Sequence, residues 1–139
     1  MASFNFRPRF LNIRMQFHIN FIKEPPPLNL VLSPNVIITP NSLVPGQSAK
    51  FNVSGTLFND LFEGIADLRI QFIDSSQWPI GNPYYQYFNE SFPAGTSFSI
   101  VAPKVDVPSN LPSKYVIEVV IEAQILADIY GCSLADGRK

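Results

Sequence analysis

The chain has 139 residues, of which 46% are hydrophobic, 13% are aromatic and only 15% are charged, and its formal net charge is −1. This length fits one domain, and the composition is typical of a globular protein that can bury a sizeable core. The sequence contains no block of basic residues and no run of 18 apolar residues. We therefore expect neither a nucleic-acid partner nor a transmembrane helix.

Residues 1–27 form an atypical N-terminal segment. Apolar and polar residues alternate strictly at positions 11–21, which is the period of a strand with one buried face. The same stretch also fits a degenerate leader, although Arg14 and His18 interrupt it and no small-residue cleavage site follows. Both interpretations stay open. Pro25, Pro26 and Pro27 then provide a stiff spacer before a predicted domain at residues 28–139.

From residue 28 onwards the sequence predicts short strands separated by turns. The expected strands are at residues 28–32, 36–39, 49–57, 66–72, 84–88, 98–102, 115–125 and 128–133, with a loop at 78–83. Pro-Asn-Ser at 40–42 and Pro-Gly at 45–46 are typical of turns. The many β-branched residues at 116–121 argue against a helix there. The pattern indicates an all-β fold, an antiparallel sandwich or barrel. The charged side chains alternate with the apolar ones, so we expect solvent to cover them.

Catalytic and metal-binding patterns are weak in this sequence. His18 is the only histidine and Cys132 the only cysteine, so a nucleophile–base pair or a His/Cys metal cluster has no support. A single cysteine also excludes an intramolecular disulfide. We find no glycine-rich phosphate loop. A carboxylate pair for glycoside hydrolysis stays open, but we predict a non-enzymatic protein with no catalytic residue, cofactor or metal.

Two further features are the N-x-Ser sequons and a dense group of aromatic residues. Asn52 and Asn89 are the candidate N-glycosylation sites. The aromatic group, which is either ordinary core or the wall of an apolar cavity, consists of Trp78, Tyr84, Tyr85, Tyr87, Phe88 and Phe92.

Several segments, in order and spacing, resemble the ML lipid-recognition domain family. They are residues 36–40 (VIITP), 44–47 (VPGQ), 51–57 (FNVSGTL), 79–84 (PIGNPY), 90–98 (ESFPAGTSF), 111–115 (LPSKY) and 130–132 (YGC). The likeness is to the fungal phosphatidylglycerol/phosphatidylinositol transfer protein branch, with Niemann–Pick type C2 sterol carriers and group 2 mite allergens as more distant relatives. It covers roughly residues 28–135, and its specificity lies in several matching turns rather than in one motif.

The resemblance implies an immunoglobulin-like sandwich of two antiparallel sheets with an apolar cavity between them. It further implies binding and transfer of a lipid, either a phospholipid or a sterol, by a secreted or lumenal monomer in transient contact with membranes. The chain departs from the family in two ways. It has no convincing signal peptide, so a cytoplasmic location stays open, and Cys132 matches the late family cysteine while its early partner, expected near residues 24–32, is missing.

The candidate lipid-binding residues are the apolar members of the inward stripes. They are Phe51, Val53, Leu68, Ile70, Phe72, Tyr87, Phe98, Ile100, Ile117, Val119 and Ile121. The alternative is a sandwich with a filled interior that binds a protein or a glycan through exposed aromatic residues around Trp78 and residues 84–87.

Overall fold

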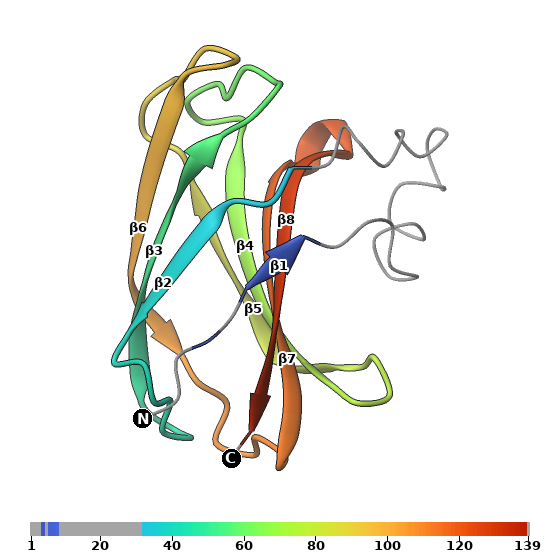
Figure 1. Cartoon of the computed structure of the whole chain (residues 1–139). Helices are drawn as coiled ribbons and strands as arrows, with labels where there is room; N and C mark the ends of the chain where they lie inside the picture. Colours follow the sequence, from blue (N-terminus) through green and yellow to red (C-terminus); the bar gives the residue numbers. More distant parts are fainter. Residues whose placement is uncertain (1–3, 5, 9–31, 139) are drawn as a thin grey trace.

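The computed structural model describes residues 4, 6–8 and 32–138, and it is an immunoglobulin-like sandwich of two antiparallel β-sheets (Figure 1). The five-stranded sheet has the order β1-β8-β7-β4-β5, and the three-stranded sheet has the order β2-β3-β6. The elements are β1 (Arg7–Pro8), β2 (Asn35–Thr39), β3 (Ser48–Thr56), β4 (Asp67–Asp74), β5 (Pro79–Tyr87), β6 (Ser97–Asp106), β7 (Lys114–Ala123), the 3-10 helix η2 (Gln124–Leu126) and β8 (Asp128–Arg138). The predicted all-β sandwich is therefore confirmed.

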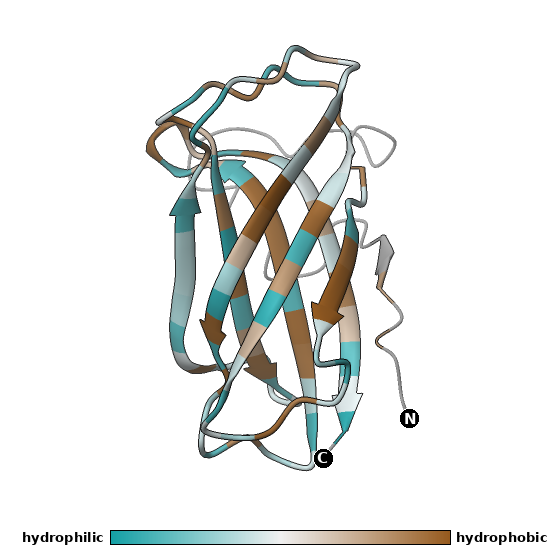
Figure 2. Cartoon of the chain, turned by 90° about the vertical axis from the view of Figure 1, so that its left-hand side faces the viewer, coloured by the Kyte–Doolittle hydropathy of each residue, from teal (hydrophilic) through white to brown (hydrophobic). Residues whose placement is uncertain are grey.

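The alternation of apolar and polar residues in the sequence determines which side chains of each strand face the interior. In β3, Ala49, Phe51 and Val53 are buried, while Lys50 is exposed and Asn52 is half-buried on the outer face. Figure 2 shows this change from hydrophobic to hydrophilic residues along the strands of the three-stranded sheet. Successive side chains of a strand point to opposite faces, so one face of this sheet is available for burial.

The core lies between the two sheets. On the inner face of the five-stranded sheet, β4 pairs with β7 so that Leu68 lies opposite Ile121 and Ile70 opposite Val119. Each of these side chains is at most 1% exposed. Complete burial of an aliphatic side chain of this size contributes about 1.5–3 kcal/mol relative to exposure, so this face provides much of the driving force for folding.

Aromatic rings close one end of the sandwich. This end, called the upper end below, is where β3, β5 and β7 finish and where β4, β6 and β8 begin. The rings of Phe88, Phe92 and Phe98 meet there edge to face, with centroids 6.0–6.3 Å apart. Edge-to-face pairs at this distance add stability beyond the area that they bury.

Several element boundaries differ from the sequence-based prediction. β6 continues through Pro103 to Asp106, where an end at 102 was expected, and β8 continues to Arg138, where an end at 133 was expected. Residues 78–83 were expected to form a loop, but β5 already begins at Pro79. A bulge explains the difference: Ile80 lies opposite Phe72 and Tyr84 opposite Ile70, so three residues of β5 face one residue of β4. The strand expected at 115–125 ends at Ala123. Residues 124–126 form η2 instead, and Ala127 follows in the left-handed conformation.

The N-terminal predictions fall mostly outside the described residues. The alternating stretch at 11–21 and the proline spacer lie outside them, as does all of the expected strand at 28–32 except Leu32. Leu32 forms a single parallel bridge with Gly131. The described residues of the N-terminal segment reach the five-stranded sheet, because Arg7 pairs with Leu134 and Pro8 with Ser133.

Candidate ligand-binding groove

Ten of the eleven predicted site residues meet in one apolar layer between the sheets. They are Phe51 and Val53 of β3, Leu68, Ile70 and Phe72 of β4, Phe98 and Ile100 of β6, and Ile117, Val119 and Ile121 of β7. The inward assignment of Tyr87 is wrong, since its side chain is 59% exposed. Tyr87 pairs with Asp67 on the outer face of the sheet, whereas Tyr84 pairs with the inward Ile70. Ile80, Tyr84 and Gln86 of β5 therefore face the interior, and the bulge, which adds two residues, leaves this alternation in phase.

A groove opens between the sheets at the edge formed by β5 and β6. Its volume is about 260 Å³. Among the described strands, β5 pairs only with β4 and β6 only with β3, so no ladder joins the two sheets at this edge. The groove is lined by Ile70, Phe72, Gly81, Asn82, Pro83, Tyr84, Lys104, Val105, Asp106 and Pro108. Ile70 and Phe72 belong to the interior layer, so this groove connects that layer to the surface.

Hydrogen bonds close the part of the same edge that lies nearer the upper end. Gln86 donates from Nε2 to the carbonyl oxygen of Val101 in β6, at 2.9 Å. The Tyr84 hydroxyl in turn donates to Oε1 of Gln86. Burial raises the pKa of the Tyr84 phenol, so the hydroxyl stays protonated and available as a donor at neutral pH. Tyr84 therefore belongs both to this closure and to the wall of the groove.

The rim of the groove carries one cation and one anion. Lys104 and Asp106 both lie on its β6 side and are exposed. Asp106 also accepts a hydrogen bond from the Ser48 hydroxyl at 3.5 Å. Because its deep wall is apolar and its rim is polar, the groove can accept a molecule with an apolar tail and a polar head.

The opposite edge of the sandwich holds a second groove, of about 590 Å³, beside β2. It is lined by Phe4, Val36, Ile37, Ile38, Thr39, Pro40 and Asn41, none of which is charged. Phe4 and Phe6 pack against the core. Most of its lining comes from one strand and the turn that follows, and Ile38 is its one fully buried residue. The β5–β6 groove, built from both sheets, is the better-formed candidate.

The outer face of the five-stranded sheet contains a buried ionic cluster. Arg69 binds Glu118 through Nη1 at 3.0 Å and Glu122 through Nε at 3.2 Å. Asp67 lies opposite Glu122 and accepts a hydrogen bond from the backbone N–H of Gln124 at 3.2 Å. None of these four charged residues is more than 6% exposed, so the expectation that solvent covers them is wrong. Arg69 is the one cation beside three carboxyl groups, so its two ion pairs offset only part of the acidic charge that is buried here.

Burial changes the protonation of this cluster. It raises the pKa of Glu122 to about 7, and the adjacent Asp67 acts in the same direction, while Arg69 opposes both. Burial also raises the pKa of Asp67, against the lowering effects of the Gln124 amide, Glu122 and Arg69. None of the cluster residues lines either groove. The cluster therefore lies outside the candidate site, on the opposite face of the five-stranded sheet.

Other predicted features lie away from the groove. Cys132 is buried in β8 beside Val120 and Leu134. Of the sequons, Asn89 is exposed in the loop after β5, whereas Asn52 is half-buried in the central strand of its sheet. Within residues 4, 6–8 and 32–138, no group of three or more His, Cys, Asp or Glu side chains could hold a metal ion. In the same part of the chain, no helix is long and apolar enough to cross a membrane.

Comparisons with known proteins add little to this geometry. No protein-family profile matches the chain, and no curated protein matches it. A crystal structure of a β-glucuronidase from Bacteroides uniformis is similar to it with a TM-score of 0.48 and 12% sequence identity. The similarity covers 74% of this chain but only 13% of the enzyme chain. A similarity at this level does not bear on the activity of this protein.

Proposed function

We propose that this protein binds a lipid between its two β-sheets and transfers it without any chemical step. The observation that carries the proposal is the groove at the β5–β6 edge, because it joins the surface to Ile70 and Phe72 of the interior layer. The likeness to the ML lipid-recognition family, which places a lipid between the sheets, supports the same location.

The energetics of an apolar tail suit this site. Each methylene group that leaves water contributes about 0.8 kcal/mol, so ten of them supply about 8 kcal/mol before the costs of ordering and of sheet separation. The sheets can separate most easily along the β5–β6 edge, since no backbone ladder has to break there. The tail would then contact the neighbours of Ile70 and Phe72 in the interior layer.

The head group of the lipid would remain at the rim. Lys104 offers a cation and the Tyr84 hydroxyl oxygen, whose hydrogen is donated to Gln86, offers a hydrogen-bond acceptor on opposite strands of the groove. This pair suits a phospholipid phosphate through Lys104 and a sterol hydroxyl through Tyr84. We further propose a monomer that contacts membranes transiently while it exchanges its ligand, with a secreted or lumenal location following from the family likeness.

Native mass spectrometry of the purified protein, followed by organic extraction, tests the proposal. A stoichiometric phospholipid or sterol, either co-purified or taken up from mixed vesicles, is the expected result. A mass that stays at the apo value after incubation with these lipids would overturn it.

Variants locate the bound lipid. Ile70→Asp puts a charge on the groove wall and should abolish uptake, whereas Ile125→Asp makes the same chemical change at a residue that is 81% exposed and lines neither groove, and it should leave uptake unchanged. If Ile70→Asp fails to fold, Asn82→Trp fills the groove from its exposed rim. Unchanged uptake in a folded Asn82→Trp protein would place the ligand elsewhere.

A further inference from the structure

The upper end of the sandwich exposes an unusual number of large apolar side chains. They are Phe58, Phe62, Ile65, Tyr87, Ile125 and Leu126, called the apolar end below. Ile125 is the most exposed of them, at 81%. Scattered apolar residues are normal on a protein surface, but a gathering at one end marks an interaction site.

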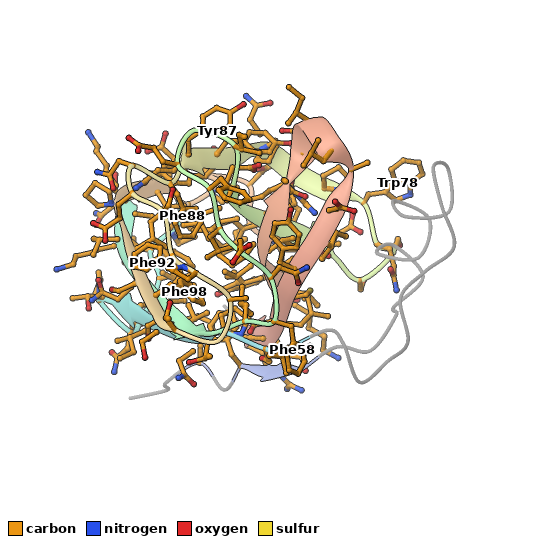
Figure 3. All side chains as sticks on the ribbon, turned by 90° about the horizontal axis from the view of Figure 1, so that it is seen from above. Phe58, Trp78, Tyr87, Phe88, Phe92 and Phe98 are labelled. Carbon is orange, nitrogen blue, oxygen red and sulfur yellow. The ribbon has the colours of Figure 1, made fainter. Side chains whose placement is uncertain are left out.

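Three loops hold these residues together. The Gly64 amide donates to the Phe88 carbonyl at 2.9 Å, which joins the loop after β3 to the loop after β5. The Gln124 amide donates to Asp67, two residues after Ile65, which brings η2 beside the loop after β3. Figure 3, the view onto this end, places Phe58 and Tyr87 at opposite sides of it, with the rings of Phe88, Phe92 and Phe98 between them. Phe88 and Phe98 are buried and Phe92 is half-buried, so these three rings form a packed cluster between the exposed side chains.

Among the residues that the structure describes, the exposed charges at this end are all negative. Asp60, Glu63 and Glu90 are exposed there. Residues 57–66, 88–96 and 124–128, which form the loops of the upper end, contain no Lys or Arg. The exposed lysines and arginines of the described strands, Lys50, Lys104, Lys114 and Arg138, all lie in the strand halves toward the other end.

We propose that the apolar end docks a protein surface that has an apolar centre surrounded by Lys and Arg. Apolar and aromatic side chains would supply the buried centre of the interface, and Asp60, Glu63 and Glu90 would select the cationic rim of the partner. The acidic side chains disfavour an anionic bilayer, because membrane surfaces that contain anionic lipids repel them.

This surface is separate from the lipid groove. The groove is lined by the first half of β5 and the last residues of β6, whereas the apolar end consists of Tyr87, the last residue of β5, and of loop and η2 residues beyond the strands. A partner on the apolar end therefore leaves the groove accessible. The proposal goes beyond lipid binding and does not depend on it.

Two model peptides test the proposal. Both are amphipathic helices with the same leucine face; one carries lysines on its polar face and the other glutamates. Binding to the isotope-labelled full chain is followed by nuclear magnetic resonance and calorimetry at low and at physiological salt. We expect the lysine peptide to shift the resonances of residues 57–66, 88–96 and 124–127, and to bind at least tenfold more tightly than the glutamate peptide.

Variants and vesicles complete the test. The double variant Phe62→Ser/Ile125→Ser should bind the lysine peptide at least tenfold more weakly. Trp78→Ser, which removes an exposed aromatic residue from the other end, should leave the affinity for this peptide unchanged. Glu63→Lys with Glu90→Lys changes only exposed loop residues and should reverse the preference between the peptides. Equal binding of both peptides, shifts confined to the groove, self-association through this end, or tighter binding to phosphatidylcholine vesicles would each overturn the proposal.

Discussion

Gln86 of β5 donates a hydrogen bond to the carbonyl oxygen of Val101 in β6, so a single side chain joins the free edges of the two sheets. The groove begins next to this bond, at Tyr84, and continues away from the upper end. The edge therefore has a closed half and an open half. This division fits a protein in which a ligand enters sideways between the sheets.

Removing this bond should ease ligand entry. We expect Gln86→Ala to lower the free energy of unfolding by about 1 kcal/mol, the usual contribution of one such hydrogen bond. Uptake of a fluorescent lipid, followed by stopped-flow fluorescence, should become faster because the sheets separate more easily. Gln47→Ala, a change at an exposed turn residue, is the control and should alter neither quantity. Lower stability with an unchanged rate of uptake would show that lipid enters elsewhere.

The charge on the rim should set head-group preference. Lys104→Glu replaces the cation at the groove by an anion, and we expect it to weaken phosphatidylglycerol or phosphatidylinositol binding about fivefold to tenfold. A neutral sterol should bind as before. Lys50→Glu makes the same change outside the groove and serves as the control. Equal losses for both variants would indicate long-range attraction rather than a head-group contact.

The buried ionic cluster should make stability depend on pH. The pKa of Glu122 is about 7 in the folded protein and near 4.5 without the effects of folding, so the folded state binds its proton more tightly. The resulting stability is fully present below pH 4.5 and disappears as the pH rises through 7, with an upper limit of about 3 kcal/mol. The raised pKa of Asp67 acts in the same direction.

Urea unfolding between pH 5 and pH 8 measures this effect. We expect the free energy of unfolding to fall across the range in the natural protein and to fall less steeply in Glu122→Gln, whose amide does not titrate, so that only Asp67 still contributes. Glu63→Gln, at an exposed loop residue, should keep the slope of the natural protein. A stability that rises with pH in the natural protein would contradict the assignment.

The sequence predicted the inner faces of most strands because their alternation survives unbroken. Residues 49–57 and 66–72 alternate throughout, and β3 and β4 bury the expected side chains. In β5 the bulge opposite Gln71 lies within a Gly-Asn-Pro stretch that has the composition of a loop. Because the bulge adds two residues, the alternation stays in phase across it, so Tyr84 and Gln86 face inward like Ile80, and the inward assignment of Tyr87 had the wrong phase.

Contacts between the two sheets were not accessible from strand patterns. Gln86 and Val101 meet only because β5 and β6 lie at the same edge of the sandwich, which depends on strand order. The same holds for Lys104 in the groove opposite Tyr84. The buried cluster was missed for another reason: Arg69 and Glu118 have the alternation of solvent-facing residues, and only their mutual pairing shows that they are buried together.

A close approach near the other end of the sandwich gives a test of the packing itself. Gly137 of β8 lies directly opposite Tyr115 of β7, and the Tyr115 ring covers it so closely that an added Cβ would overlap the ring atoms. Tyr115 is 4% exposed and also packs against Phe72, with ring centroids 6.1 Å apart, so the ring has little room to move.

Gly137→Ala should therefore lower the free energy of unfolding by about 3 kcal/mol and Tm by about 10 °C, since overpacking a well-filled site forces the ring out of place. The decisive control is a double-mutant cycle with Tyr115→Ala, because removing the ring also removes the overlap. In the Tyr115→Ala background, Gly137→Ala should have almost no effect on stability. If it costs the same in both backgrounds, the loss comes from the backbone of β8 and the close approach of ring and glycine is not its cause.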